Sequence, residues 1–200
     1  MKKLLLTGFE PFLDHGINPT ELIVKNLAGK TIRGYEVVGR VLPVEFDRSA
    51  EVLLGYVREH EPDAVVCLGL AAGRDKITPE RVAININDGV RDNNGRIPVD
   101  ELIVEDGPAA YFSTLPIRKM VNALRENGLP AEISNTAGTY LCNNVMYSLL
   151  HHYEKRSETI PAGFIHVPAS FELSVENGRL PGWPVETIQR ALEIAIGEIE

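Results

Sequence analysis

Residues 63–70 read DAVVCLGL, with five apolar side chains in succession at residues 64–68 and Pro62 directly before them. A short, unbroken apolar run of this kind is typical of a strand that is buried on both faces of a parallel sheet. Cys67 lies inside the run, so we expect its thiol to belong to the core. The segment therefore predicts a central strand with helices on both sides.

Strands and helices alternate on either side of this segment. Asn18 and Asp47 are expected to cap helices, and helical spacing recurs at residues 117–124, 141–150 and from Pro184 onward. Further strands are expected at residues 3–8, 35–44, 82–87, 131–134 and 163–167. The alternation predicts an α/β fold: a single catalytic domain over residues 1–200, with a twisted, largely parallel mixed sheet and helices on both faces, like phosphorylases and hydrolases.

Composition narrows the class of partner. The net charge is −8 and no stripe of lysine and arginine is present, which argues against a nucleic-acid partner. The sequence has neither a basic amphipathic segment nor an apolar run long enough to span a membrane, so we expect no membrane partner. A small or neutral partner is favoured.

The cysteines indicate the compartment. Two cysteines cannot form a disulfide framework, and neither has metal-ligand spacing with the five histidines. We expect both thiols to be reduced, in the cytoplasm. The first residues, MKKLLLTGFEPF, begin like a signal peptide, but their apolar run at residues 4–6 is short and a strand is the better interpretation.

The sequence SNTAGTYLCNNVMYSLLHHY, residues 134–153, brings Cys142 to the first turn of an expected helix. The unpaired amides and the positive dipole end of a helix N-terminus favour a thiolate, which is the nucleophilic form of cysteine. The same amides could hold an oxyanion. The competing interpretation is that Cys142 is a small apolar residue on a buried helix face.

Active sites of such sheets gather at the carboxyl ends of the strands. Cys142 and His166 are expected at two of these ends, and Glu80 lies in the segment beyond a third. A cysteine nucleophile needs a base, and an imidazole base needs a third group to fix its tautomer. These residues predict a cysteine hydrolase, although His166 could be a hydrogen-bonded core residue and Glu80 could face solvent or pair with Arg81.

Several sequence blocks stand in order along the chain: TGFEPF at 7–12, NPT at 18–20, ITPERVAIN at 77–85, GPAAYFSTLPI at 107–117, SNTAGTYLCN at 134–143 and HVP at 166–168. Together they resemble the pyrrolidone-carboxyl peptidases, also called pyroglutamyl peptidases. The resemblance covers nearly the whole chain. It implies a catalytic triad of Glu80, Cys142 and His166.

The resemblance also implies the reaction and the assembly. The implied reaction removes an N-terminal pyroglutamyl residue from a peptide by acyl transfer to the cysteine and hydrolysis of the thioester. No metal and no organic cofactor is implied, and the implied assembly is a homo-oligomer, with a tetramer favoured and a dimer possible. In proteins similar to this one the aromatics of the GFEPF block line the lactam recess, which selects Phe9 and Phe12, although both could be ordinary core aromatics.

Asn18, Leu70 and Arg91 complete the expected substrate-binding residues. Leu70 stands where some family members carry glutamine, so a side-chain hydrogen bond to the lactam is not expected from this position. The loop that holds Arg91 is one residue shorter than the similar loop of relatives, and this arginine is the weakest of the candidates. The alternative function is a non-peptidase small-molecule binder or a phosphorylase-like protein on the same scaffold.

Overall fold

The computed structural model describes residues 1–12, 16–176 and 178–200, so part of the loop expected between the first strand and Asn18 lies outside the described residues. Its main sheet has the strand order β2-β3-β1-β4-β8-β5. Four neighbouring strands are parallel: β1 (Lys2–Phe9), β3 (Tyr35–Leu42), β4 (Ala64–Leu70) and β8 (Ala162–Val167). The short edge strands β2 (Thr31–Ile32) and β5 (Thr78–Pro79) are antiparallel to their neighbours. The predicted mixed, largely parallel sheet is confirmed.

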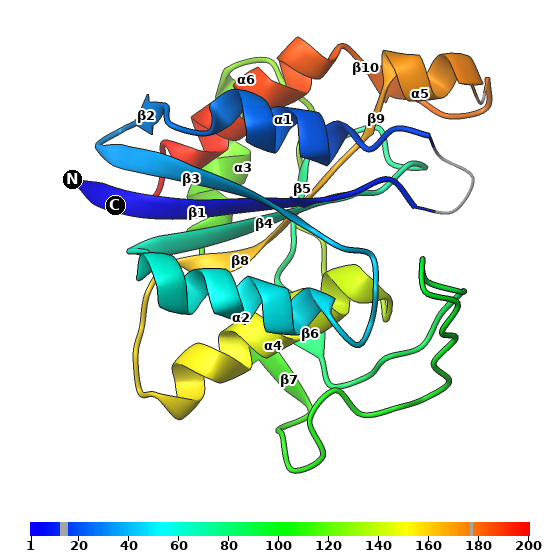
Figure 1. The fold of residues 1–200 in the computed structure, drawn as a ribbon. Coiled ribbons are helices and arrows are strands. Elements are labelled where there is room, and N and C mark those ends of the chain that lie inside the picture. The colour runs from blue at the N-terminus through cyan, green and yellow to red at the C-terminus, as the bar shows by residue number, and fades with distance from the viewer. Residues whose placement is uncertain (13–15, 177) are drawn as a thin grey trace.

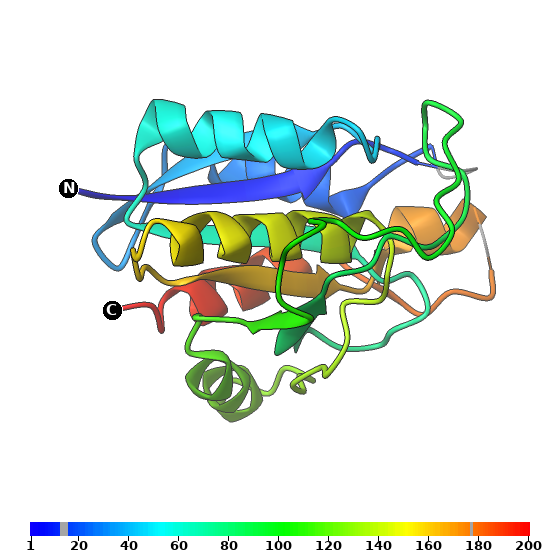
Figure 2. The ribbon, with the colours of Figure 1, turned by 90° about the horizontal axis from the view of Figure 1, so that it is seen from below.

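Helices cover both faces of this sheet, as predicted (Figure 1). The helices α1 (Pro19–Leu27), α3 (Ile117–Glu126) and α6 (Val185–Ile196) lie on one face, and α2 (Ser49–His60) and α4 (Leu141–Lys155) lie on the other. Seen along the sheet, the layers form one domain, with both chain termini at the same end (Figure 2).

The pleat of the strands divides the core into two halves. Successive strand side chains point to opposite faces, so Leu4 and Leu6 pack against α1, α3 and α6, while Leu5 packs against α2 and α4. The same rule places Val66 on the first face and Cys67 on the second. Every residue of β4 is buried, so the interpretation of residues 63–70 as a central strand, and of Cys67 as a core residue, is confirmed.

Two expectations about helix and strand boundaries were wrong. Asp47 does not cap α2; its carboxylate pairs with Arg96 instead, and the residue before the helix is Arg48. Residues 131–134 do not form a strand, because they meet the neighbouring segment only through isolated bridges, one of which joins Glu80 to Ser134. Asn18 does cap α1, where its Oδ1 accepts a hydrogen bond from the Thr20 amide at 3.1 Å.

Smaller elements surround the carboxyl ends of the parallel strands. The antiparallel pair β6 (Val82–Ile84) and β7 (Ala110–Phe112) lies beside α4. The turn-rich segment that follows β8 forms β9 (Ala169–Ser170), the short helix α5 (Phe171–Glu176) and β10 (Gly182–Trp183). Leu173 of α5 is buried against Leu70, so this segment closes over the exit of β4.

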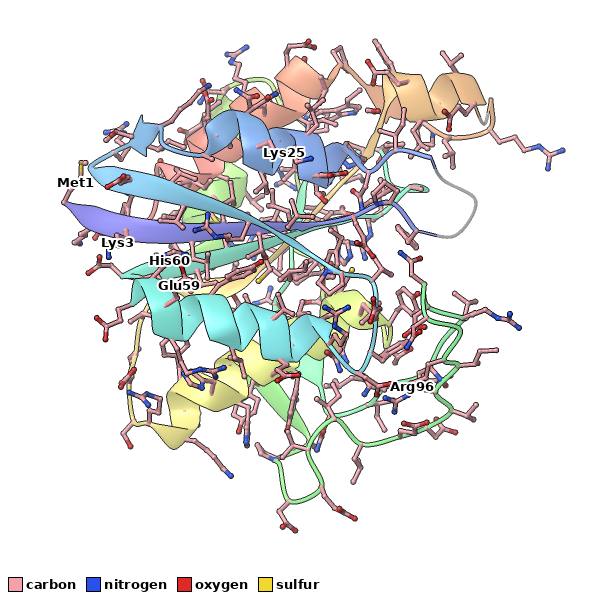
Figure 3. The ribbon with its side chains drawn as sticks, viewed as in Figure 1. Met1, Lys3, Lys25, Glu59, His60 and Arg96 are labelled. Atoms are coloured by element: carbon pink, nitrogen blue, oxygen red, sulfur yellow. The ribbon has the colours of Figure 1, made fainter. Side chains whose placement is uncertain are left out.

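Side-chain contacts tie the loops to this frame (Figure 3). Lys3 Nζ donates to the His60 carbonyl at 3.0 Å, which joins the start of β1 to the end of α2. Arg96 pairs with both Asp47 and Glu101 and so holds the long loop between β6 and β7. Among the helices that the structure describes, none has the length and apolar content needed to cross a bilayer.

Candidate active site

The site residues converge where β1, β4 and β8 end. Phe9 and Leu70 are the last residues of β1 and β4, and His166 precedes the last residue of β8. The helix α4 also begins at the carboxyl ends of these strands, and Cys142 is its second residue. Tyr140 stands at the N-cap of α4, and its side chain caps none of the first-turn amides, so these amides keep their donor capacity.

Asn143, beside Cys142, fixes the start of α4 against β6. Its Oδ1 accepts from the Ile84 amide at 2.9 Å, and its Nδ2 donates to the carbonyls of Ile84 and Ile86 at 2.8 and 2.9 Å. The side chain is fully buried, and both its amide nitrogen and its oxygen are hydrogen-bonded. The position of Cys142 is therefore set by the main chain of a neighbouring strand as well as by its own helix.

The Cys142 sulfur lies against the strand that pairs with β8. A Cβ added to Gly69 would come within 2.9 Å of Cys142 Sγ and within 2.6 Å of the Phe164 ring. Gly69 is the register partner of His166, whose ring centre lies 4.9 Å from that of Phe164. Because residue 69 is a glycine, there is room for the Cys142 sulfur against β4, next to the strand β8 that carries His166.

The third residue of the predicted triad reaches His166 through strand pairing. Thr78 of β5 is the antiparallel partner of His166, so Glu80, two residues later, lies on the same face beside it. Glu80 Oε1 and His166 Nδ1 are 2.7 Å apart, and Glu80 is fully buried. A carboxylate only accepts hydrogen bonds, so Nδ1 carries the proton and Nε2 is the free acceptor.

Sequence reasoning missed Arg74. Its Nη1 donates to Glu80 Oε1 at 2.8 Å and to Thr78 Oγ1 at 2.6 Å. The small residues of this loop drew attention away from it, and the available signal was an arginine six positions before the candidate carboxylate. The contact depends on how the loop after β4 turns back toward β5, which the sequence pattern does not specify.

The charge states of the pair follow from burial and from these contacts. Burial pushes the pKa of Glu80 upward, but the hydrogen bond and charge of His166, with smaller contributions from Ser134 and Arg74, hold this pKa below its ordinary value. Burial lowers the pKa of His166; Glu80 opposes that shift and Arg74 adds to it. At neutral pH the site therefore holds an ionised Glu80 beside a neutral His166.

The expectation of a resting Cys142 thiolate was wrong. Burial raises the pKa of this thiol to about 12, and the negative charge of Glu80 adds to the rise. Arg74 and the cysteine's own backbone amide lower the pKa, but they do not offset the desolvation. The helix N-terminus is present as predicted. However, the free energy that a thiolate would lose on desolvation exceeds the electrostatic stabilisation that the helix N-terminus would give it.

A small recess opens beside Cys142. It is lined by Phe9, Phe12, Asn18, Val44, Leu70, Tyr140, Leu141 and Cys142. Four of the expected substrate-binding residues thus lie together on its wall. The aromatic rings support one another: the Tyr140 ring centre lies 5.1 Å from that of Phe46 in an edge-on contact and 6.3 Å from that of Phe12.

Asn18 makes the cap that the sequence predicted, and both Asn18 and Arg91 make further contacts that the sequence did not indicate. The Asn18 amide nitrogen donates to the Glu10 carbonyl at 3.1 Å, and its oxygen caps α1, so the side chain is engaged in holding the loop. Arg91 is exposed and is not among the lining residues of the recess. Its backbone carbonyl accepts a hydrogen bond from the Tyr140 hydroxyl at 3.2 Å, so it reaches the recess through the main chain.

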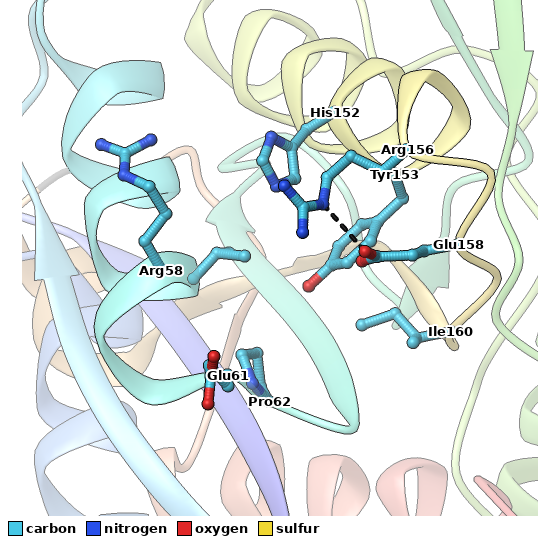
Figure 4. Close-up of a pocket in the computed structure, with 9 residues that line it drawn as sticks. Arg58, Glu61, Pro62, His152, Tyr153, Arg156, Glu158 and Ile160 are labelled. Carbon is cyan, nitrogen blue, oxygen red and sulfur yellow. Dashed lines mark hydrogen bonds and ion pairs between the residues drawn. The ribbon is translucent and has the colours of Figure 1, made fainter.

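A wider pocket lies at the opposite end of the strands, beside the residues that precede β4 and β8 (Figure 4). It is bounded by the ends of α2 and α4 and by Pro62 and Ile160, which precede β4 and β8. Arg156 in this pocket is already paired with Glu158 at 2.9 Å. This pocket holds none of the expected site residues and lies away from the carboxyl ends of the strands, where the active sites of such sheets gather. Within the described part of the chain, no three His, Cys, Asp or Glu side chains gather as a metal site would require.

Comparisons with known proteins agree on one family. The family model for pyroglutamyl peptidase matches residues 2–200. A pyrrolidone-carboxylate peptidase of Oceanobacillus iheyensis is 55% identical over 98% of each chain, and one of Lysinibacillus sphaericus is 57% identical over 99% of this chain and 97% of its own. The solved pyrrolidone carboxyl peptidase of Thermococcus litoralis has a TM-score of 0.94 at 46% identity, covering 98% of this chain and 92% of its own. Pyroglutamyl peptidase I of Bacillus amyloliquefaciens has a TM-score of 0.95 at 40% identity, covering 100% and 97%.

The raised pKa of Cys142 predicts how the free thiol titrates. The thiolate absorbs in the ultraviolet, so the difference in absorbance between the native chain and Cys142→Ser reports this residue alone. We expect no thiolate signal from Cys142 at neutral pH and a signal that grows only above pH 9.0, the ordinary value, because the folded pKa is higher still. A full thiolate signal already present at neutral pH would contradict this assignment.

Proposed function

Since the chain belongs to the pyroglutamyl peptidase family, a family of cysteine hydrolases, we propose that it removes N-terminal pyroglutamyl residues through the triad Cys142, His166 and Glu80. The observation that carries the proposal is the hydrogen bond of 2.7 Å between His166 Nδ1 and Glu80, beside the sulfur at the start of α4. This bond leaves His166 Nε2 as the acceptor for the thiol proton.

The first step forms a tetrahedral intermediate at the pyroglutamyl carbonyl. As Cys142 Sγ attacks the pyroglutamyl carbonyl carbon, its proton passes to Nε2 of His166, because both groups are neutral at rest. The imidazolium that forms faces the ionised Glu80, which stabilises the new positive charge. A preformed thiolate is not needed, since proton transfer and attack accompany each other.

The second half of the reaction returns the enzyme to its starting state. The imidazolium gives its proton to the nitrogen of the departing peptide as the carbon–nitrogen bond breaks, which leaves a pyroglutamyl thioester and a free amine. Water then attacks the thioester carbon while His166 takes its proton. Pyroglutamic acid leaves, and the proton returns to the sulfur.

The start of α4 supplies the stabilisation of the oxyanion in this proposal. Each attack turns the carbonyl oxygen into an oxyanion next to Cys142, where the first-turn amides of α4 have no acceptor within the helix. The helix dipole favours negative charge at the same place. Removing one donor of an oxyanion site costs a rate factor of roughly 10² to 10³, so this contribution is a large one.

The recess suits a flat, neutral ring. Phe9 and Phe12 offer aromatic walls, and Leu70 contributes apolar surface where a polar side chain would offer a hydrogen bond. A peptide with a charged amino terminus would have to bury that charge without a partner, which disfavours it strongly. Recognition of the lactam amide then falls to backbone groups around the recess.

The alternative of a phosphorylase-like or non-peptidase binder has no support in these contacts. Such a protein needs a loop that binds an anion, whereas the recess beside Cys142 is apolar and aromatic. The family model covers almost the whole chain, which favours the peptidase.

We further propose that the chain acts in the cytoplasm as a homo-oligomer. The two free thiols support the compartment, because disulfides are rare in the cytoplasm. The exposed apolar side chains of Val99 and Phe112, at 69% and 71%, support the assembly. Light scattering of the purified chain is expected to give more than one chain per particle, and a monomeric mass at micromolar concentration would reject the assembly. Cell fractionation tests the compartment.

Replacement of the nucleophile tests the reaction. The native chain is expected to release the fluorescent amine from a pyroglutamyl amide, and Cys142→Ser is expected to lose that activity by a factor of roughly 10³ or more, because a serine hydroxyl is a much poorer nucleophile in a site built for a thiol. The matched control is Cys67→Ser, in the core, whose activity should stay within a few-fold of the native chain. Equal rates in Cys142→Ser and the native chain would reject the mechanism.

The aromatic side chains of the recess predict how substrate affinity changes when one of them is replaced. Phe12→Ala is expected to raise KM for a pyroglutamyl amide by roughly 10-fold with a smaller change in kcat, because the lost ring contact serves binding of the ground state and transition state alike. Phe171→Ala removes a half-exposed aromatic of α5 and is the control. A KM in Phe12→Ala equal to that of the control would show that the recess does not hold the ring.

A further inference from the structure

Arg74 lies outside the proposed triad but contacts one of its members. We propose that Arg74 is a positioning residue that acts on His166 through Glu80: it holds the carboxylate in the orientation that bonds Nδ1, and it places a permanent positive charge beside the triad. This inference rests on the proposed function, since it concerns how the triad is held in its working arrangement.

Both hydrogen-bond donors to Glu80 bind the same carboxylate oxygen. Glu80 Oε1 accepts from His166 Nδ1 at 2.7 Å and from Arg74 Nη1 at 2.8 Å. The other oxygen, Oε2, is buried and has no hydrogen-bond partner among the described residues. The Ser134 hydroxyl, which faces the carboxylate, donates instead to the Thr136 carbonyl at 3.0 Å. The carboxylate is therefore held through Oε1 alone, and Arg74 supplies one of its two restraints.

Arg74 is itself held from several sides. Its Nη1 donates to Thr78 Oγ1 at 2.6 Å, and its Nη2 approaches the Thr136 carbonyl at 3.4 Å. Its own amide donates to the Ala71 carbonyl at 2.9 Å in the turn after β4. A planar guanidinium can reach these acceptors together, whereas the single ammonium of a lysine cannot. Arg74 thus connects the turn after β4, the strand β5 and the segment that leads to α4.

The charge of Arg74 acts on all three members of the triad. The charged groups that act on the pKa of His166 are Glu80, from the segment after β5, and Arg74, from the turn after β4. Cys142 of α4 lies against Gly69, the register partner of His166. The guanidinium opposes the protonation of His166 and favours the ionised forms of Glu80 and Cys142. Only a third of its side-chain surface is exposed, so water screens this charge less than it would on the surface.

The sign of the effect on activity follows from the role of His166. The base works only when Nε2 is unprotonated, so the rate falls as the pH drops through the pKa of His166. Without Arg74 the imidazolium loses a repelling neighbour, and the pKa of His166 rises. The acid side of the pH profile of kcat/KM then moves to higher pH.

The test compares Arg74→Met with the native chain over the acid range. We expect kcat/KM at neutral pH to fall by roughly 10- to 100-fold, a part of the 10² to 10⁴ that a positioned base contributes, with KM changed by less than about 3-fold. The acid midpoint of kcat/KM should move upward by a measurable fraction of a pH unit. Arg74→Lys, which keeps the charge but not the planar donor geometry, should restore the acid midpoint and recover only part of the rate.

A neighbouring arginine gives the matched control. Arg81 follows Glu80 in sequence, and its Nε donates to Asn135 Oδ1 at 2.7 Å. Arg81→Met therefore removes a guanidinium from the same segment without removing a contact to the carboxylate, and its pH profile should match that of the native chain. If Arg74→Met does not fold, Arg74→Gln, which retains donors but no charge, takes its place in the same measurement.

The outcomes separate this inference from the proposed function. If Arg74→Met keeps the native kcat/KM within 2-fold and the native acid midpoint, the positioning role is wrong, while loss of activity in Cys142→Ser still supports the peptidase mechanism. If the rate falls but the acid midpoint stays in place in both Arg74→Met and Arg81→Met, the effect is structural and the inference is overturned. If Cys142→Ser stays active, the proposed mechanism itself fails.

Discussion

The hydrogen bond between Glu80 and His166 is the contact on which the rest of the site depends. It exists because β5 runs antiparallel to β8, so Thr78 opposes His166 and the carboxylate two residues later lies on the same face. A buried carboxylate is costly unless it is paired, and here the imidazole and Arg74 supply that pairing. The pairing keeps Nδ1 protonated, and the free nitrogen of His166 follows from it.

Burial sets the character of the nucleophile. Cys142 stands at a helix N-terminus, a place that by itself favours a thiolate, but the recess removes water from the sulfur and the pKa of the thiol rises. In the resting site a neutral thiol therefore lies near a neutral imidazole, rather than a thiolate near an imidazolium. In the proposed mechanism, the thiol ionises only during the reaction, when Glu80 faces the imidazolium and the first turn of α4 faces the oxyanion.

The pleat of the sheet explains why an apolar recess lies next to polar chemistry. Side chains on the face of α2 and α4 include Phe9, Cys67 and Phe164, and the sulfur of Cys142 rests against the same face at Gly69. At the strand ends the apolar core continues into the recess wall, and Leu173 of α5 covers Leu70 from the far side. The same apolar residues therefore pack around the thiol and line the recess.

Periodicity in the sequence alone determined the central strand, the alternation of strands and helices, the cap at Asn18 and the start of a helix at Cys142, because these depend on neighbours within a few residues. Positions at strand ends made Cys142, His166 and Glu80 candidates, and the family resemblance implied that they form a triad. Only the tertiary structure decided the contacts of Arg74, the main-chain role of Arg91 and the raised pKa of Cys142. Each of these depends on distances between segments far apart in the chain and on how much water the fold excludes, and local patterns carry neither.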